Sequence, residues 1–127
     1  MVKTISNTKR VSSLKFALIV NTSVVNSYSA LKFAEAVLNL KHSIQAIFFY
    51  QHGVNLANAF IDLPQDETNI QQNWQTLAKQ HAINLIVCSS SALRQGIQLD
   101  KLADQFIIGS LGQLTEIISS SDRVITF

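Results

Sequence analysis

The feature that most constrains the fold is a series of short apolar runs that alternate with segments of helical periodicity. Residues 14–20, 44–50 and 83–87 are apolar at most positions. Runs of this length and composition are typical of strands buried on both faces of a parallel sheet. Between the runs, apolar residues recur every three or four positions, as they do on one face of a helix. The alternation predicts an α/β protein with parallel strands joined by helices.

Each element can be given an approximate range. We expect further strands at residues 106–108 and 123–127, and helices at residues 27–40 and 54–61. Asp66 or Thr68 could cap the next helix, and residues 99–103 could form a short helical turn. The predicted architecture is a three-layer α/β/α sandwich with a mainly parallel five-stranded sheet, similar to flavodoxins. Two helices have a predicted buried face: Ile70, Trp74, Leu77, Ala78 and His81 in one, and Leu111, Leu114, Thr115 and Ile118 in the last.

Length and composition bound the domain and its surroundings. The chain has 127 residues, which suits one domain at residues 14–127 after a loosely ordered polar extension at residues 1–13. Its net charge of +2 does not by itself indicate a nucleic-acid partner. No apolar run approaches the roughly 20 residues of a membrane span. A single cysteine cannot form an internal disulfide, which favours a reducing compartment, and we expect the cytoplasm.

The candidate functional residue is that single cysteine, Cys88. It ends the apolar run at residues 83–87 and is followed by three serines, any of which could be the N-cap of a short helix that Gly96 could end. Ligands of open α/β sheets bind outside the carboxyl ends of the strands. The backbone N–H groups at a helix start favour a thiolate over a thiol. The functional interpretation is therefore a reactive, partly exposed cysteine, to which Arg94 could add positive charge.

Other interpretations of these residues remain open. A lone cysteine after an apolar run is often a small core residue. His52 follows another strand at the same predicted edge and could pair with Cys88, although a loop histidine without this role is the simpler expectation. The three histidines, His42, His52 and His81, show no metal-ligand spacing with the cysteine. The hydroxyl-rich loop at residues 21–27 is placed like a phosphate loop but contains no glycine.

Several segments together resemble the TusD/DsrE family of sulfur-relay proteins. The most specific are a Cys-x-x-x-Ala-x-Arg-x-Gly pattern from Cys88 to Gly96 and a Phe-Phe-Tyr-x-x-Gly-Val-x-x-Ala-Asn pattern from Phe48 to Asn58. The loop after the first strand departs from the family, whose members often have a glycine there. The remaining similar segments are residues 16–20, 30–36, 109–114 and 122–127.

The resemblance implies a DsrE-like fold and sulfurtransferase activity. In the family the cysteine matched by Cys88 accepts sulfane sulfur as a persulfide and passes it on. The TusD branch, which this chain resembles most, sends the sulfur toward 2-thiolation of the tRNA wobble uridine, and the DsrE branch serves dissimilatory sulfur oxidation. The implied partners are TusB-like and TusC-like subunits in a heterohexamer, a TusA-like donor and a TusE-like acceptor. Neither a cofactor nor a metal is implied, and no contact with a membrane or with nucleic acid.

Two functions of other classes compete with the sulfur relay. The chain could be a scaffold subunit whose cysteine is inert, or a flavodoxin-like module that binds a nucleotide or flavin through the loop at residues 21–27. Sulfur transfer needs one thiolate on each protein and no metal. One cysteine in the chain is therefore sufficient for the relay.

Overall fold

The computed structural model describes residues 13–63 and 69–127, and these residues form one five-stranded sheet. Its strand order is β4-β3-β2-β1-β5, and all four neighbouring pairs are parallel. The predicted extension at residues 1–13 lies almost wholly outside the described residues. The strands are β1 (Lys15–Val20), β2 (Ser43–Phe49), β3 (Asn84–Cys88), β4 (Phe106–Gly109) and β5 (Arg123–Thr126).

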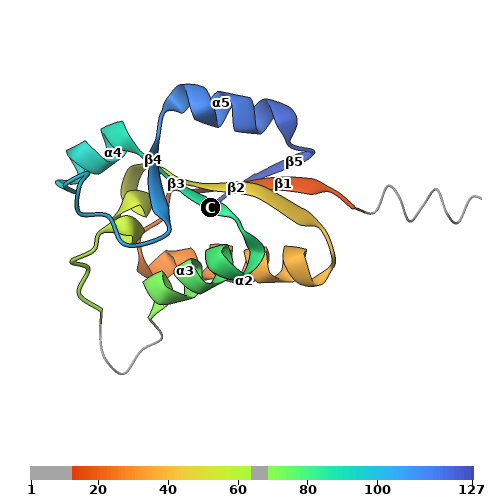
Figure 1. Cartoon of the computed structure of the whole chain (residues 1–127), viewed down its shortest axis with the longest axis horizontal. Helices are drawn as coiled ribbons and strands as arrows, with labels where there is room; N and C mark the ends of the chain where they lie inside the picture. Colours follow the sequence, from red (N-terminus) through yellow and green to blue (C-terminus); the bar gives the residue numbers. More distant parts are fainter. Residues whose placement is uncertain (1–12, 64–68) are drawn as a thin grey trace, which may run out of the picture.

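Helices cover both faces of the sheet, which confirms the three-layer α/β/α arrangement (Figure 1). Helices α2 (Tyr28–Asn39) and α3 (Ile70–His81) lie on one face, and α5 (Leu111–Ser120) lies on the other. The short helix α4 (Ser89–Arg94) and the 3-10 segment η2 (Gln51–Ala57) contact each other near the carboxyl end of the sheet. A second 3-10 turn, η1 (Val25–Ser27), precedes α2.

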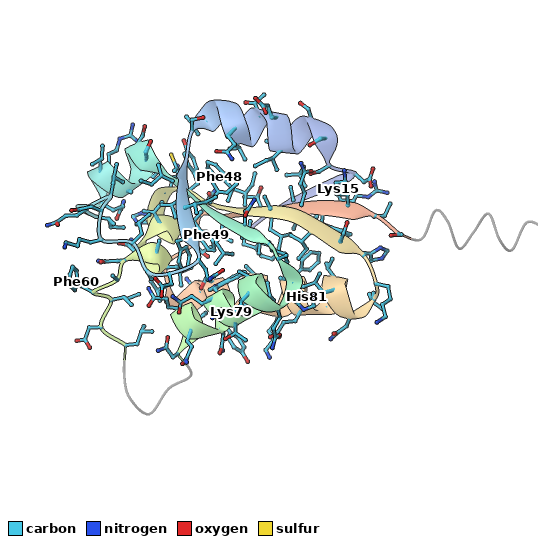
Figure 2. All side chains as sticks on the ribbon, viewed as in Figure 1. Lys15, Phe48, Phe49, Phe60, Lys79 and His81 are labelled. Carbon is cyan, nitrogen blue, oxygen red and sulfur yellow. The ribbon has the colours of Figure 1, made fainter. Side chains whose placement is uncertain are left out.

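The core forms where the central strands meet the α2 and α3 layer. Trp74 of α3 is fully buried, and its ring lies edge-on to Phe49 of β2, with the centroids 5.4 Å apart. Phe48 and Phe49 lie between the helical layers in Figure 2, as the apolar pattern predicts. Burying side chains of this size contributes about 1.5–3 kcal/mol each. The long apolar runs therefore became the interior strands β1, β2 and β3.

Helix α3 begins at a different residue from the one predicted. Asn69 is its N-cap, and the Asn69 side chain accepts a hydrogen bond from the backbone N–H of Gln72 at 3.0 Å. This bond satisfies one of the N–H groups left without a partner at a helix start. The expected caps, Asp66 and Thr68, lie outside the described residues. Four of the five residues on the predicted face are buried, but His81, the last residue of α3, is exposed.

Two predicted helical segments are confirmed only in part, because tertiary contacts determine the local backbone. The expected helix at 54–61 is the 3-10 segment η2, which begins and ends earlier, and the Gln71 side chain donates to the carbonyl groups of Leu56 and Asn58, both at 2.8 Å. Residues 99–103 form no helix, only a single turn closed by the Lys101 N–H on the Gln98 carbonyl at 2.9 Å. In that stretch Leu102 makes an isolated antiparallel bridge to Asn58. The bridge ties this stretch to the end of η2.

Helix α5 is rotated relative to the prediction. Ile117 is its buried residue, whereas Leu111, Thr115 and Ile118 are exposed. The rotation accompanies a register irregularity in the β1–β2 pairing, where Phe16 pairs with Ile44 but Ala17 pairs with Ala46. The intervening Gln45 reaches the end of α5, where its side chain bonds the Ser120 hydroxyl at 2.7 Å and the Ser121 hydroxyl at 2.8 Å. These hydrogen bonds orient α5. Because polar groups make them, the apolar pattern of the sequence does not predict this orientation.

Candidate functional site

The fold places Cys88 where the sequence predicts, at the carboxyl end of β3 and immediately before α4. The cysteine is the N-cap residue of α4 and has extended backbone angles, φ −67° and ψ 117°. Its side chain makes no capping hydrogen bond. The three serines that follow it belong to the first turn of α4 rather than preceding it as caps. Gly96 has a φ of 78° after the end of α4, as the left-handed ending predicts.

The Cys88 side chain is buried, as the interpretation as a core residue predicts and contrary to the partial exposure expected of a reactive thiol. Only 1% of its surface is accessible, and its neighbours Leu85, Ile86 and Val87 are equally buried. The reason is its position in the ladder: β3 is an interior strand with β2 on one side and β4 on the other. Attack on an external sulfur atom therefore requires a movement that uncovers the thiol. Cys88 is therefore a core residue and at the same time occupies the position expected of the functional cysteine.

A buried hydrogen bond joins α4 to η2 beside the cysteine. The Ser91 hydroxyl accepts a hydrogen bond from the backbone N–H of Gln51 at 3.0 Å, and Ser91 is buried. Gln51 has a φ of 50°, in the left-handed region that residues with a side chain rarely adopt. The bond satisfies a backbone group at this strained turn. The sequence indicates a serine-rich helix start here, but not which hydroxyl faces inward.

Gly53 brings η2 against the end of β1. A Cβ atom at this position would lie 1.9 Å from the Val20 carbonyl oxygen and 2.8 Å from its carbon. Both contacts are to backbone atoms, so a side chain could be accommodated only by moving η2 away from the sheet. The glycine in the Phe48 to Asn58 pattern therefore has a steric function, which is to hold η2 against the carboxyl end of the sheet.

Replacing Gly53 with alanine is expected to destabilise the protein by about 1–3 kcal/mol or more, the usual cost of overpacking. Urea denaturation measures this free energy of unfolding. Gly112→Ala is the matched control, because a Cβ there meets only the Ser110 hydroxyl at 3.7 Å. In the first turn of α5 that alanine should be neutral or slightly stabilising. Equal effects of the two substitutions would contradict the steric role of Gly53.

The structure does not bring the other candidate residues to the thiol. Arg94 is exposed and lies at the opposite end of α4 from Cys88. His52 lies in η2 and is exposed, without a hydrogen bond to Cys88 in the described part of the chain. His42 has a structural role, since its Nδ1 accepts the Leu14 backbone N–H at 3.0 Å. These placements leave Cys88 as the nucleophile candidate.

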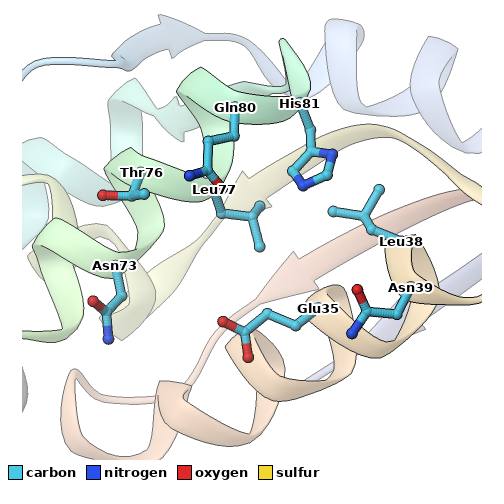
Figure 3. A pocket seen from close by; sticks show the side chains of 8 residues that line it. All are labelled: Glu35, Leu38, Asn39, Asn73, Thr76, Leu77, Gln80 and His81. Atoms are coloured by element: carbon cyan, nitrogen blue, oxygen red, sulfur yellow. The ribbon is translucent and has the colours of Figure 1, made fainter.

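His81 lines a groove of about 350 Å³ between α2 and α3 (Figure 3). Leu38 and Leu77 contribute apolar surface to it, and Glu35 contributes a carboxylate. That carboxylate already pairs with Lys32 of the same helix, at 3.3 Å. Across residues 13–63 and 69–127, no three His, Cys, Asp or Glu side chains are grouped as metal ligands. All residues that line the groove belong to α2 and α3, so the groove is separate from the cysteine at the end of β3.

The hydroxyl-rich loop after β1 is held by the ends of neighbouring strands. The Asn21 backbone N–H donates to the Phe127 carbonyl at 2.8 Å, and the Ser27 hydroxyl donates to the Val24 carbonyl at 2.7 Å. The side-chain oxygens of Asn21 and Thr22 are buried without a hydrogen-bond partner in the described residues. The loop thus lies at the carboxyl edge of the sheet, as predicted, but without a glycine to admit a phosphate closely.

Three elements next to Cys88 each expose a large apolar side chain. Leu93 of α4 is 63% exposed, Ile107 of β4 is 45% exposed and Leu111 of α5 is 48% exposed. Strand β4 is the edge strand paired with the cysteine strand, and α4 and α5 begin directly after β3 and β4. Exposed apolar residues around a site are typical of surfaces that contact other proteins.

Residues 14–127, which contain the whole sheet and the cysteine, match the model of the DsrE/DsrF-like family. The chain belongs to this family. A relative from Vibrio parahaemolyticus, named as a sulfurtransferase TusD homolog, is 37% identical over 90% of this chain and 98% of its own. The sulfurtransferase TusD of Serratia proteamaculans is 38% identical over 78% of this chain and 85% of its own. The resemblance stated from the motifs is thereby confirmed.

A solved structure supports the DsrE-like fold independently of the close relatives. The YchN protein of Escherichia coli superposes with a TM-score of 0.78, covers 90% of this chain and 99% of its own, and is 23% identical. At this identity the similarity concerns the fold alone. None of the helices within the described ranges is long and apolar enough to cross a membrane.

Proposed function

We propose that this DsrE-family protein is a sulfurtransferase that carries sulfane sulfur as a persulfide on Cys88. The observation that carries the proposal is the position of the only cysteine, at the carboxyl end of an interior strand and at the start of a helix. Backbone N–H groups at a helix start stabilise a negative charge placed there, such as the outer sulfur of a persulfide. The relatives named as sulfurtransferases support this activity.

The transfer is a thiol–persulfide exchange without net oxidation or reduction. The Cys88 thiolate attacks the outer sulfur of a persulfide on the donor, a new S–S bond forms at Cys88, and the donor's S–S bond breaks. The donor leaves as a thiolate, which takes up a proton, and the proton of the Cys88 thiol goes to solvent. The acceptor's thiolate then attacks the outer sulfur on Cys88 by the same reaction. No metal or cofactor takes part in these steps.

The pathway we propose is that of the TusD branch, toward 2-thiolation of the tRNA wobble uridine. The level of identity to proteins named TusD supports this choice. TusB-like and TusC-like subunits would assemble with this chain, and TusA-like and TusE-like proteins would deliver and remove the sulfur. The exposed apolar side chains of α4, β4 and α5 offer surface for such partners. The reducing cytoplasm suits a mechanism that depends on one free cysteine.

The test is sulfur loading followed by discharge. The protein is incubated with a persulfidated donor, freed of it, and examined by intact mass spectrometry and peptide mapping. We expect a gain of one sulfur atom on the peptide that contains Cys88, reversed by a thiol reductant. Addition of a TusE-like acceptor should return the protein to its original mass. A protein that gains no sulfur from any persulfide donor, alone or with its TusB-like and TusC-like partners, would contradict the proposal.

A further inference from the structure

The burial of Cys88 raises the question of which neighbouring group moves when the thiol reacts. In the β3–β4 ladder Cys88 is paired with Gly109, so the two residues are direct neighbours on the same face of the sheet. Paired residues of adjacent strands lie about 4.8 Å apart. Gly109 has no side chain, and the space beside the cysteine is therefore filled from elsewhere.

Two side chains occupy the space that a side chain at Gly109, the ladder partner of Cys88, would take. A Cβ atom built on Gly109 would lie 2.3 Å from the Ile86 Cγ2 atom and 2.6 Å from the Gln113 Oε1 atom. Ile86 is buried in β3, two residues before Cys88 on the same face, and a β-branched side chain in a strand has few alternative rotamers. Gln113 extends from the first turn of α5, and its carboxamide is at the end of a flexible side chain. Of these two side chains, that of Gln113 is therefore the one that can move.

A groove next to the Gln113 carboxamide can receive it. Gln113 lines a groove of about 390 Å³ between α5 and strands β2 and β3, together with Asn84 and Ile86. Within the described residues no other group forms a hydrogen bond with the Gln113 side chain, whose helix is capped through the Ser110 hydroxyl and the Gln113 backbone N–H. Rotation of the side chain toward the groove thus breaks no such bond and leaves the helix cap intact.

From these contacts we infer that Gln113 controls access to the Cys88 thiol and is a positioning residue for the sulfur transfer. The inference rests on the proposed function. In the closed arrangement the carboxamide occupies the space beside Cys88. In the open arrangement it swings into the groove, and the incoming sulfur takes its place. After the transfer, the amide lies next to the negatively charged outer sulfur of the persulfide. A neutral amide is compatible with that charge, whereas a carboxylate would repel it.

The test measures alkylation of Cys88, the only thiol, with neutral iodoacetamide and with anionic iodoacetate. Gln113→Ala removes the side chain that covers the thiol and should accelerate both alkylation reactions roughly two- to tenfold. The reason is that the reagent no longer has to displace an ordered side chain. Gln113→Leu restores the bulk and should return the rates to that of the wild type. Gln113→Glu should slow iodoacetate about fivefold relative to iodoacetamide, because two like charges would lie close together. Thr115→Ala, exposed on the same helix, is the control.

Either of two results overturns the inference. One is an alanine variant that reacts like the wild type or like Gln113→Leu, and the other is a glutamate variant that slows both reagents equally. Urea denaturation of each variant separates access from global unfolding. Alkylation needs no persulfide, so failure of sulfur loading in the wild type would contradict the proposed function without changing these rates. Normal loading with unaltered alkylation ratios would instead contradict the role of Gln113 alone.

Discussion

Replacing Cys88 with alanine is expected to abolish sulfur loading completely while the protein remains folded. The chain has no second cysteine that could take over the exchange reaction. Alanine is small and apolar, and the loss of one buried heavy atom costs about 1 kcal/mol of folding stability. The measurement combines intact mass after incubation with a persulfide donor and the free energy of unfolding in urea. A Cys88→Ala protein that still acquires a transferable sulfur would place the chemistry elsewhere.

Serine at the same position gives a second, independent expectation. Cys88→Ser should be equally inactive but at least as stable as Cys88→Ala. Cys88 is the N-cap residue of α4, and a serine hydroxyl at that position accepts a hydrogen bond from a backbone N–H of the first turn, which is worth about 0.5–2 kcal/mol relative to alanine. Since only 1% of the Cys88 surface is accessible, this bond rather than water has to satisfy the hydroxyl. A serine variant clearly less stable than the alanine variant would show that no N–H group of α4 reaches the side chain at this position.

Trp74→Ala is expected to be the most destabilising core substitution, lowering the free energy of unfolding by about 3–5 kcal/mol. Trp74 is fully buried and packs edge-on against Phe49, so its removal leaves a cavity between α3 and the sheet. The total stability of a domain is only about 5–15 kcal/mol, so this variant should lose a large part of it. Urea denaturation with the midpoint and slope fitted separately measures the change.

Two other aromatic substitutions serve as controls for Trp74→Ala. Trp74→Phe should cost much less, because it keeps an aromatic ring against Phe49 and the buried indole N–H has no hydrogen-bond partner in residues 13–63 and 69–127. Phe60→Ala should change stability by no more than about 0.5 kcal/mol, since Phe60 is 71% exposed and lies at the periphery in Figure 2. A large effect at Phe60 and a small one at Trp74 would contradict the assigned core.

The elements that the sequence predicted well are those marked by a local apolar or amphipathic pattern. The apolar runs became β1, β2 and β3, and the periodic segment at residues 27–40 became α2. In these segments the hydrophobic term dominates, and it depends on the residue types themselves. The prediction was less accurate where polar contacts over long sequence distances determine the geometry. The rotation of α5 depends on Gln45, more than 70 residues earlier, and the backbone of η2 depends on Gln71.

The candidate site likewise has some features that depend on neighbouring residues and others that depend on distant segments. The motif around Cys88 indicated the cysteine, the end of its strand and the helix that follows, because all three are local in the sequence. It left open whether the thiol is buried or partly exposed, and the tertiary structure decides for burial, because β4 pairs on the far side of β3. Nor did it indicate Gln113, whose carboxamide borders Gly109, the ladder partner of Cys88. A glycine that ends a short strand was the one available signal.

The sequence by itself thus determined the α/β class, the family and the identity of the nucleophile candidate, since apolar periodicity and a local motif are properties of neighbouring residues. Only the tertiary structure decided how that thiol is covered and which side chain must move to expose it. The physical reason is that burial depends on groups contributed by distant segments, here α5 and the edge strand β4, whose placement no local pattern contains.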